Sequence, residues 1–340
     1  MAKDRIKIWI LHAGIEHPSP YFYNFCFELN TYENYEYIVN PELPLEKKID
    51  KGIIYFNRLK RFYNNDNIET ANDFLNNVDY LKQKGWKIVW TLHNFFPIDR
   101  EINYVDEYVT SEFIKKCDLV FTLSEYMKKS IKEHFDINAI NHGVGINKLN
   151  NNCINPKIKE IKKSKKFTFT FIGNIYKYKM LDQLIKSFDK MKDCRLIIAG
   201  REAKNANVNI KHLIGNNKNI IYINAFVDEN DWKELAKVTD VFVSLYDLKF
   251  LAFKYGFFPS NYINIAKTGI RCISPRSDII EEMISNEQLI TYDFDDKNGL
   301  YNAMLKARSS VSNKVNVDRI YNYSWKETVN KFVNSCNKLF

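Results

Sequence analysis

Short runs of β-branched and aromatic residues alternate with longer amphipathic stretches along the first half of the chain. The apolar runs that predict strands are 6–11, 52–57, 87–92 and 117–124. The stretches with helical periodicity are 21–29, 69–83, 108–116 and 125–134. Buried apolar strands that alternate with helices are typical of a parallel sheet covered on both faces. The pattern therefore predicts a doubly wound α/β domain.

The pattern is interrupted at 150–166, which is polar and poorly periodic, and then starts again. New strands are predicted at 166–172, 195–200, 220–223, 240–245 and 270–274, with helices at 180–188 and 228–237 among them. A chain of 340 residues exceeds the size at which one hydrophobic core usually keeps growing. We therefore predict an N-terminal domain (1–150), a linker (151–166), a second doubly wound domain (167–318) and a C-terminal helix (319–340).

Polar residues follow directly after the apolar run 87–92. His93 and Asn94 stand where this strand should end, and Pro97 prevents a simple continuation of the strand. Open α/β sheets bind ligands at the carboxyl ends of their strands, so His93 and Asn94 are candidate site residues. The alternative is that both side chains only satisfy hydrogen bonds of the loop backbone.

The composition is that of a globular protein, with 45% hydrophobic and 27% charged residues, and this excludes a disordered chain. The six cysteines lie far apart without histidines at zinc spacing, so neither a metal module nor a disulfide framework is indicated. No apolar run reaches the length of a membrane span. We expect a cytoplasmic protein, with peripheral contact at the inner face of the cell membrane as a second expectation.

The net charge of +9 is unevenly distributed. Residues 1–148 contain 19 Lys and Arg against 21 Asp and Glu, so the excess of positive charge lies in the second half. Part of it is the basic run 157–166, which is either a solvated linker or a surface that attracts an anionic ligand or lipid. No helix-turn-helix, zinc-finger or RNP-type pattern accompanies the charge, so nucleic acid is not an expected partner.

Several stretches, in order along nearly the whole chain, resemble the GT-B glycosyltransferases. Residues 90–99 are similar to that family's W-T-x-H-N-x-x-P-H-[ED] stretch, and 171–188 to its F-x-G-x-x-x-x-Y-K-G-x-x-x-L-I-x-x-F stretch. Residues 240–246 look like its A-D-V-x-x-x-x-Y strand end, and 268–275 like its F-G-x-P-V-I-A-P stretch. The most similar subgroup comprises bacterial enzymes that extend exopolysaccharide, capsule or glycolipid chains.

The resemblance implies two Rossmann-like domains facing a central cleft, with the C-terminal helix packing back toward the N-domain. The second domain would bind a nucleotide-diphosphate sugar, with Lys179 on the diphosphate and Ser260 capping a helix whose first N–H groups face the phosphate. The donor-binding residues predicted in this way are Gly173, Asn174, Lys179, Tyr246, Gly256, Ser260, Asn261 and Asn264. A solvated lysine and an ordinary capped helix are the alternatives.

The first domain would bind the acceptor, a glycan that is lipid-linked in this subgroup. The acceptor-binding residues predicted here are His12, Gly14, His17, Asn94, Arg58 and Arg61. The basic, aromatic stretch 58–63 could meet an acceptor phosphate or the membrane, or could simply be an amphipathic helix.

Some positions depart from the family's pattern. Gly256 and Asn264 stand where related retaining enzymes have a pair of glutamates, and Met180 replaces the glycine after the lysine. These departures favour inversion, with Asp99 as the general base, Glu101 as the second candidate, and His93 as a ligand of the donor sugar or an alternative base.

No D-x-D motif stands between predicted strands, so the sequence predicts a metal-independent hexosyltransferase without a cofactor. Two alternatives stay open. One is an enzyme of the same architecture with other chemistry, such as an epimerase or a phosphorylase. The other is a non-catalytic protein that binds nucleotide sugars or glycans within a glycan assembly complex.

Overall fold

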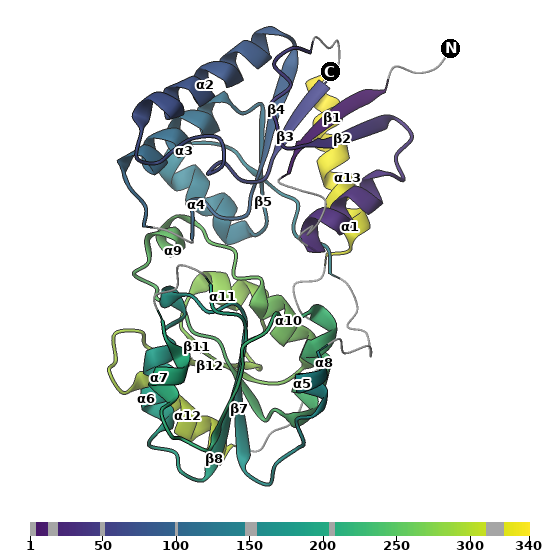
Figure 1. Cartoon of the computed structure of the whole chain (residues 1–340). Coiled ribbons are helices and arrows are strands. Elements are labelled where there is room, and N and C mark those ends of the chain that lie inside the picture. Colours follow the sequence, from purple (N-terminus) through teal and green to yellow (C-terminus); the bar gives the residue numbers. More distant parts are fainter. Residues whose placement is uncertain are drawn as a thin grey trace. The chain divides into compact units, whose positions relative to one another are not determined.

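The computed structural model describes residues 5–12, 20–47, 52–98, 101–146, 155–203, 208–310 and 323–340. These residues form two compact units (Figure 1). The first unit is Met1–Asn147 together with Leu251–Phe258 and Asn322–Phe340, and the second is Lys148–Phe250 together with Pro259–Tyr321. Each unit is described by itself below.

The first unit is built on a six-stranded parallel sheet with the strand order β2-β1-β3-β4-β5-β6. Its strands are β1 (Ile6–Leu11), β2 (Tyr35–Asn40), β3 (Gly52–Phe56), β4 (Trp86–Leu92), β5 (Leu119–Thr122) and β6 (Ile140–Asn141). All five residues of β3 are buried, as expected of a central strand covered on both faces. The predicted doubly wound sheet is therefore confirmed for this unit.

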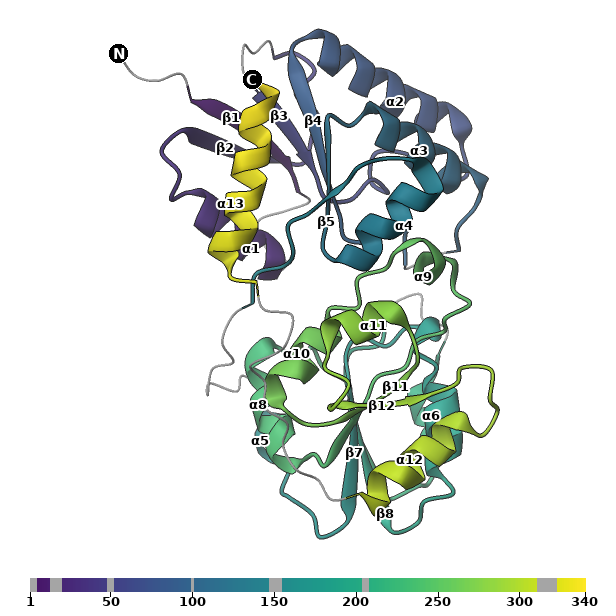
Figure 2. The same cartoon turned by 180° about the vertical axis from the view of Figure 1, so that it is seen from behind.

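Helices cover both faces of the first sheet, as Figures 1 and 2 show. On one face lie α1 (Pro20–Leu29) and α13 (Trp325–Cys336), and on the other α2 (Ile68–Gln83), α3 (Tyr104–Lys116) and α4 (Glu125–Phe135). The ring of Phe332 on α13 packs edge-on against Phe25 of α1, with the ring centroids 5.0 Å apart. The C-terminal helix thus packs on the N-terminal sheet, as predicted.

The second unit repeats this architecture with the strand order β12-β11-β10-β7-β8-β9. Its strands, all parallel, are β7 (Phe167–Ile172), β8 (Cys194–Ala199), β9 (Ile220–Ile223), β10 (Val241–Val243), β11 (Cys272–Pro275) and β12 (Leu289–Tyr292). Its helices are α5 (Pro156–Lys159), α6 (Leu181–Phe188), α7 (Ile210–Ile214), α8 (Glu229–Val238), α10 (Asn261–Thr268), α11 (Asp278–Met283) and α12 (Gly299–Ser309), besides the 3-10 turn η1 (Lys177–Lys179).

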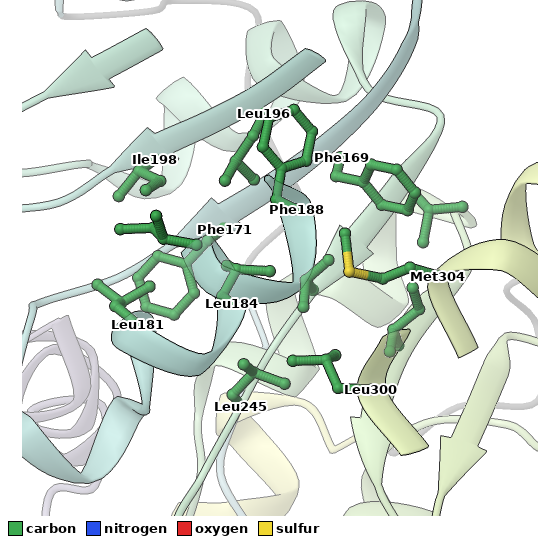
Figure 3. Close-up of a cluster of buried hydrophobic side chains, with 14 of the residues drawn as sticks. Phe169, Phe171, Leu181, Leu184, Phe188, Leu196, Ile198, Leu245, Leu300 and Met304 are labelled. Carbon is green, nitrogen blue, oxygen red and sulfur yellow. The ribbon is translucent and has the colours of Figure 1, made fainter. Parts of the chain in front are cut away.

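A continuous hydrophobic core fills the space between this sheet and the helices α6 and α12 (Figure 3). Phe169 and Phe171 of β7 meet Leu184 and Phe188 of α6, and Met304 of α12 closes the cluster. Each of these side chains is at most 1% exposed. Because β7 lies in the middle of the sheet, this packing fixes the position at which β7 ends and the next turn begins.

Four elements differ from the sequence-based expectation, and two of these differences have a local cause. β2 was not predicted, because this edge strand is only partly buried and reads as polar. β12 and α12 were also not predicted. α3 begins at Tyr104 rather than 108, because Asn103 and Asp106 form a capping box at its start.

The segment Leu251–Phe258, which contains α9 (Leu251–Tyr255), groups with the first unit, although the sequence analysis placed it in the second domain. The Tyr255 ring packs on Phe95, Phe96 and His134 of the first unit. These contacts join residues far apart in sequence, so hydrophobic periodicity could not assign the segment to a unit. Among the described helices, none has both the length and the apolar character required to cross a membrane.

Candidate functional site

A tight turn follows the central strand of the second unit. Gly173 comes directly after β7, has φ +134, and donates its N–H to the Ala199 carbonyl over 3.0 Å. The Asn261 amide nitrogen donates to the Ile172 carbonyl over 2.9 Å, and it lies 2.4 Å from where a Cβ on residue 173 would stand. Two predicted donor-binding residues, Gly173 and Asn261, are therefore brought together, and only glycine fits at position 173. Asn174 follows them and is exposed.

The turn leads through the 3-10 turn η1 to α6, and Lys179 is the last residue of η1. Met180, which stands where the family has glycine, adopts a left-handed conformation with φ 51 and ψ 37. The backbone bend that glycine would provide is thus kept without the glycine, at a cost of about 1 kcal/mol for a side chain in this region. Lys179 therefore keeps its place at the end of η1 although methionine stands where the family has glycine.

Lys179 is buried, with 4% of its surface exposed. Its Nζ lies 3.5 Å from the ring centroid of Tyr246 and 5.6 Å from that of Tyr178. Among the ion pairs and hydrogen bonds of the described residues, none involves the Lys179 ammonium. Burial lowers the pKa of Lys179 well below its usual range, because the charged form loses its hydration. The structure therefore holds a desolvated lysine amine that has a ring but no carboxylate beside it, and a bound anion would favour its protonated form.

The start of α10 differs from the prediction. Ser260 was expected to cap this helix, but its side chain accepts no capping hydrogen bond and is exposed. The Tyr262 N–H, expected to face a phosphate, donates instead to the Pro259 carbonyl over 3.1 Å. Asn264 accepts a hydrogen bond from the Lys267 ammonium over 3.3 Å. The turn geometry at Ser260, which has helical dihedrals, explains why the predicted cap does not form.

Gly256 lies in the segment Leu251–Phe258, which groups with the first unit. Its carbonyl accepts the Phe95 N–H over 3.3 Å, and the neighbouring Phe257 pairs with Asn94 in an antiparallel bridge. Gly256 is buried and has φ +106, where a side chain is strained. Asn94, predicted on the acceptor side, and Gly256, predicted on the donor side, are thus brought together.

A chain of hydrogen-bonded side chains crosses the carboxyl ends of the strands in the first unit. The Tyr21 and Tyr55 hydroxyls are 3.3 Å apart, the Tyr55 hydroxyl donates to Thr91 over 2.8 Å, and the Thr91 hydroxyl lies 3.1 Å from His142 Nε2. His142 Nδ1 lies 2.7 Å from the Gly143 carbonyl, so this nitrogen carries the proton and Nε2 accepts. Burial lowers the pKa of His142 to about 4.

This chain of side chains, called the tyrosine relay below, consists of Tyr21, Tyr55, Thr91 and His142. The sequence analysis predicted none of these four as a site residue. In the sequence, each of them is a polar residue at or near the end of a strand or helix in an otherwise apolar run. Many buried hydroxyl groups share this pattern, so it does not identify a site. Tyr55 and Thr91 lie on the neighbouring strands β3 and β4, and their contact depends on the pairing of these two strands, in which Phe56 lies opposite Trp90.

His93 lies next to the tyrosine relay, with its ring edge-on to that of Tyr21 at a centroid distance of 4.4 Å. Burial, with Arg58, His142 and His12 as further causes, lowers the pKa of His93 to about 3. His93 is therefore neutral at physiological pH, with one ring nitrogen donating and the other accepting. His12 stacks on Phe22 at 4.0 Å.

The other predicted residues of the first unit are less uniform in their placement. Arg58 and Glu101 are exposed. Arg61 donates to the Pro41 carbonyl, and burial lowers the pKa of its guanidinium, so this side chain is engaged within the unit. Gly14, His17 and Asp99 lie outside the described residues.

Comparison with known proteins shows which family and which solved structures this chain resembles. Residues 155–307 match the family described as "Glycosyl transferases group 1". The fold is similar to that of the Candida albicans trehalose-6-phosphate phosphatase N-terminal domain, with a TM-score of 0.66 at 10% identity over 99% of this chain and 97% of that one. It is also similar to Anabaena HepE in complex with UDP-glucose, with a TM-score of 0.64 at 10% identity over 97% of this chain and 100% of that one.

These likenesses show the fold, which is GT-B. Residues 155–307, which make up most of the second unit, are similar to the group 1 glycosyl transferases. An uncharacterized glycosyltransferase of Methanocaldococcus jannaschii is 28% identical over 235 residues, which are 62% of this chain and 59% of that relative. The match thus spans less than two thirds of the relative's length. The resemblance noted from the sequence motifs is confirmed.

The family also corrects one expectation. Group 1 glycosyl transferases are retaining, so the preference for inversion was wrong. The absence of the two glutamates does not indicate the stereochemical outcome. Replacing a side chain does not by itself change the face of the donor sugar from which the acceptor approaches. A general base opposite the leaving group belongs to an inverting reaction, so the base role given to Asp99, and second to Glu101, loses its basis. Among the described residues, no group of three or more His, Cys, Asp or Glu could hold a metal ion.

Proposed function

We propose that this protein transfers a hexose from a nucleotide-diphosphate sugar to a glycan acceptor, with retention of configuration and without a metal. The observation that carries the proposal is Lys179, a buried lysine that follows the Gly173 turn along the chain and has no acidic partner among the described residues. The turn and the lysine both lie within the segment that matches the group 1 family.

The proposed chemistry depends on the charge that develops on the leaving group. When the bond between the sugar and the diphosphate breaks, negative charge grows on the diphosphate oxygens. A preorganised cation in a site with little water stabilises such charge strongly, by about 3–4 kcal/mol for a single well-placed donor. In this proposal Lys179 pairs with the diphosphate, and the Gly173 turn permits the close approach of the donor.

The first unit takes the acceptor in this proposal. His93 is neutral, so it can donate one hydrogen bond and accept another, and this suits sugar hydroxyls better than it suits a phosphate. Asn94 and the exposed Arg58 are the further candidates on this side. The resemblance to enzymes of surface-polysaccharide synthesis supports a lipid-linked glycan as the acceptor.

The proposal is tested with UDP-glucose, the ligand in the HepE structure, as the first donor of a panel. Slow release of UDP and of glucose whose first-formed anomer is α would support a retaining transferase. Unchanged activity in EDTA is expected. Failure of every nucleotide sugar in the panel to bind or to turn over would refute the proposal.

A second candidate function is a non-catalytic protein that binds nucleotide sugars. The observation in its favour is Gly256, which has φ +106 at a position where related retaining enzymes have glutamate, and where a glutamate would be strained. A protein of this kind would bind UDP or UDP-glucose and show a raised melting temperature. It would release no UDP in the presence of any acceptor, and this separates the two candidates.

A further inference from the structure

An aromatic ring, that of Tyr246, lies next to Lys179 in the place where a carboxylate counter-ion would be expected. Most buried lysines pair with a carboxylate, because an ammonium without hydration or a partner is costly. The face of the Tyr246 ring offers negative potential to Lys179 Nζ, which lies 3.5 Å from the ring centroid. Tyr246 is itself 1% exposed, so its ring cannot be a surface on which the donor rests.

An acidic residue is close in sequence but has another role. Asp247 follows Tyr246, and its carboxylate accepts the backbone N–H of Lys249 over 3.0 Å. The backbone N–H of Asp247 donates to the Tyr178 carbonyl over 2.8 Å. Within the part of the chain that the structure describes, Asp247 makes no ion pair with Lys179. The ring therefore provides what stabilisation the ammonium has.

The Tyr246 ring is held firmly in this position. It stacks on Tyr178 with the centroids 6.1 Å apart and an angle of 19° between the planes, and it lies 5.8 Å from the ring of Tyr262. The Tyr262 hydroxyl is fixed in turn by the Ser274 hydroxyl at 2.6 Å and by the Ser244 carbonyl at 2.8 Å. The face presented to Lys179 is thus set by packing rather than by a flexible side chain.

We propose that Tyr246 is a positioning residue that holds the Lys179 ammonium on its ring face so that the remaining N–H groups are available to a diphosphate. The inference rests on the proposed function. A ring stabilises the cation without supplying an anion, so the ligand does not have to displace an internal carboxylate. A carboxylate at the same place would stabilise the ammonium more, but it would compete with the diphosphate.

This proposal changes the role expected of Tyr246. The sequence analysis named it as a donor-binding residue, whereas here it acts through Lys179 and touches no ligand. Burial lowers the pKa of Lys179, and loss of the ring would leave the amine still less able to hold its proton. A variant without the ring should therefore bind a diphosphate more weakly even though no ligand contact is removed.

The test is a calorimetric titration with UDP of the full chain and of four variants, one of which is Lys179→Met alone. Tyr246→Phe keeps the ring face and should bind UDP within about twofold of the wild type. Tyr246→trifluorophenylalanine keeps the shape but weakens the negative face, and it should bind about tenfold more weakly, the range expected of a desolvated cation–π contact. The double variant Lys179→Met with that fluorinated ring should bind no more weakly than Lys179→Met alone.

The outcomes separate the two proposals. If the wild type binds no nucleoside diphosphate, the proposed function fails. If the wild type binds UDP but the fluorinated variant binds as tightly as Tyr246→Phe, the positioning role is overturned and the proposed function is unaffected. If the double variant binds UDP more weakly than Lys179→Met alone, the positioning role is also overturned. The fluorinated ring would then weaken UDP binding without acting through Lys179.

Discussion

Buried polar groups lie near the carboxyl ends of the strands in both units, but the two units differ in whether these groups have hydrogen-bond partners. In the first unit the tyrosine relay satisfies its members internally, from the Tyr21 hydroxyl to the Gly143 carbonyl. In the second unit Lys179 lies on a ring and meets no acceptor among the described residues. A satisfied network makes a rigid wall, whereas an unsatisfied cation retains its capacity for a ligand.

The two environments also differ in the kind of ligand that each would suit under the proposed function. The first unit presents His93, neutral and adjacent to the relay, as a group that can both donate and accept. The second unit presents a cation. A neutral, hydroxyl-rich acceptor suits the first environment and an anionic leaving group suits the second.

The largest expected effect is that of Lys179→Met. UDP affinity should fall by about 100-fold or more, in line with the loss of one preorganised group that meets developing charge. The melting temperature should rise, because a buried cation without a partner is replaced by an apolar side chain of similar length. Calorimetry and thermal denaturation of the same samples measure both. Lys177→Met, an exposed lysine two residues away, is the matched control and should change neither.

Acid should destabilise the first unit through His142. Its pKa is about 4 when folded and 6.5 when free, so the unfolded chain binds more protons between these values. Stability contributed by neutral His142 is complete above pH 6.5 and should be lost toward pH 4, by about 3 kcal/mol in all. Urea denaturation at several pH values measures it. His142→Asn should flatten this dependence, and an unchanged slope in that variant would contradict the assignment.

Gly173→Ala should disturb the second unit at the turn that precedes Lys179. The added Cβ would stand 2.4 Å from the Asn261 amide nitrogen, and the backbone at φ +134 strains any side chain. We expect a loss of about 2 kcal/mol of stability and weaker UDP binding. Gly215→Ala is the matched control, because it also has positive φ but its Cβ would meet nothing within 4 Å. Equal effects of the two substitutions on UDP binding would argue against a donor role for the turn.

The smallest effect is expected from Thr91→Val, which interrupts the tyrosine relay. The substitution keeps the shape but leaves the Tyr55 hydroxyl and His142 Nε2 without their partner, at a cost of about 1–2 kcal/mol. Denaturation should detect this loss, while UDP affinity stays unchanged because the residue belongs to the first unit. A fall in UDP affinity equal to that of Lys179→Met would remove the distinction between the two units.

The sequence predicted the two parallel sheets, the packing of the C-terminal helix and the position of Lys179 after a turn. The sheets follow from local patterns of apolar strand runs and helical periodicity, whereas the packing of the C-terminal helix and the role of Lys179 were expected from the resemblance to the GT-B glycosyltransferases. The relay, the grouping of Leu251–Phe258 with the first unit and the ring under Lys179 were not predicted. Each of them depends on contacts between residues far apart in sequence, which no local pattern records. The missing cap at Ser260 shows the same limit, because a capping residue type does not fix the dihedrals of the turn.

The most direct test of the account compares UDP, UMP and uridine as ligands of the wild type and of Lys179→Met. If Lys179 is reserved for a diphosphate, the wild type should bind UDP about 100-fold more tightly than uridine, with UMP between them. That advantage should disappear in Lys179→Met while uridine binds the variant and the wild type alike. Equal affinity of the wild type for UDP and uridine, or an advantage of UDP that survives in the variant, would contradict the account.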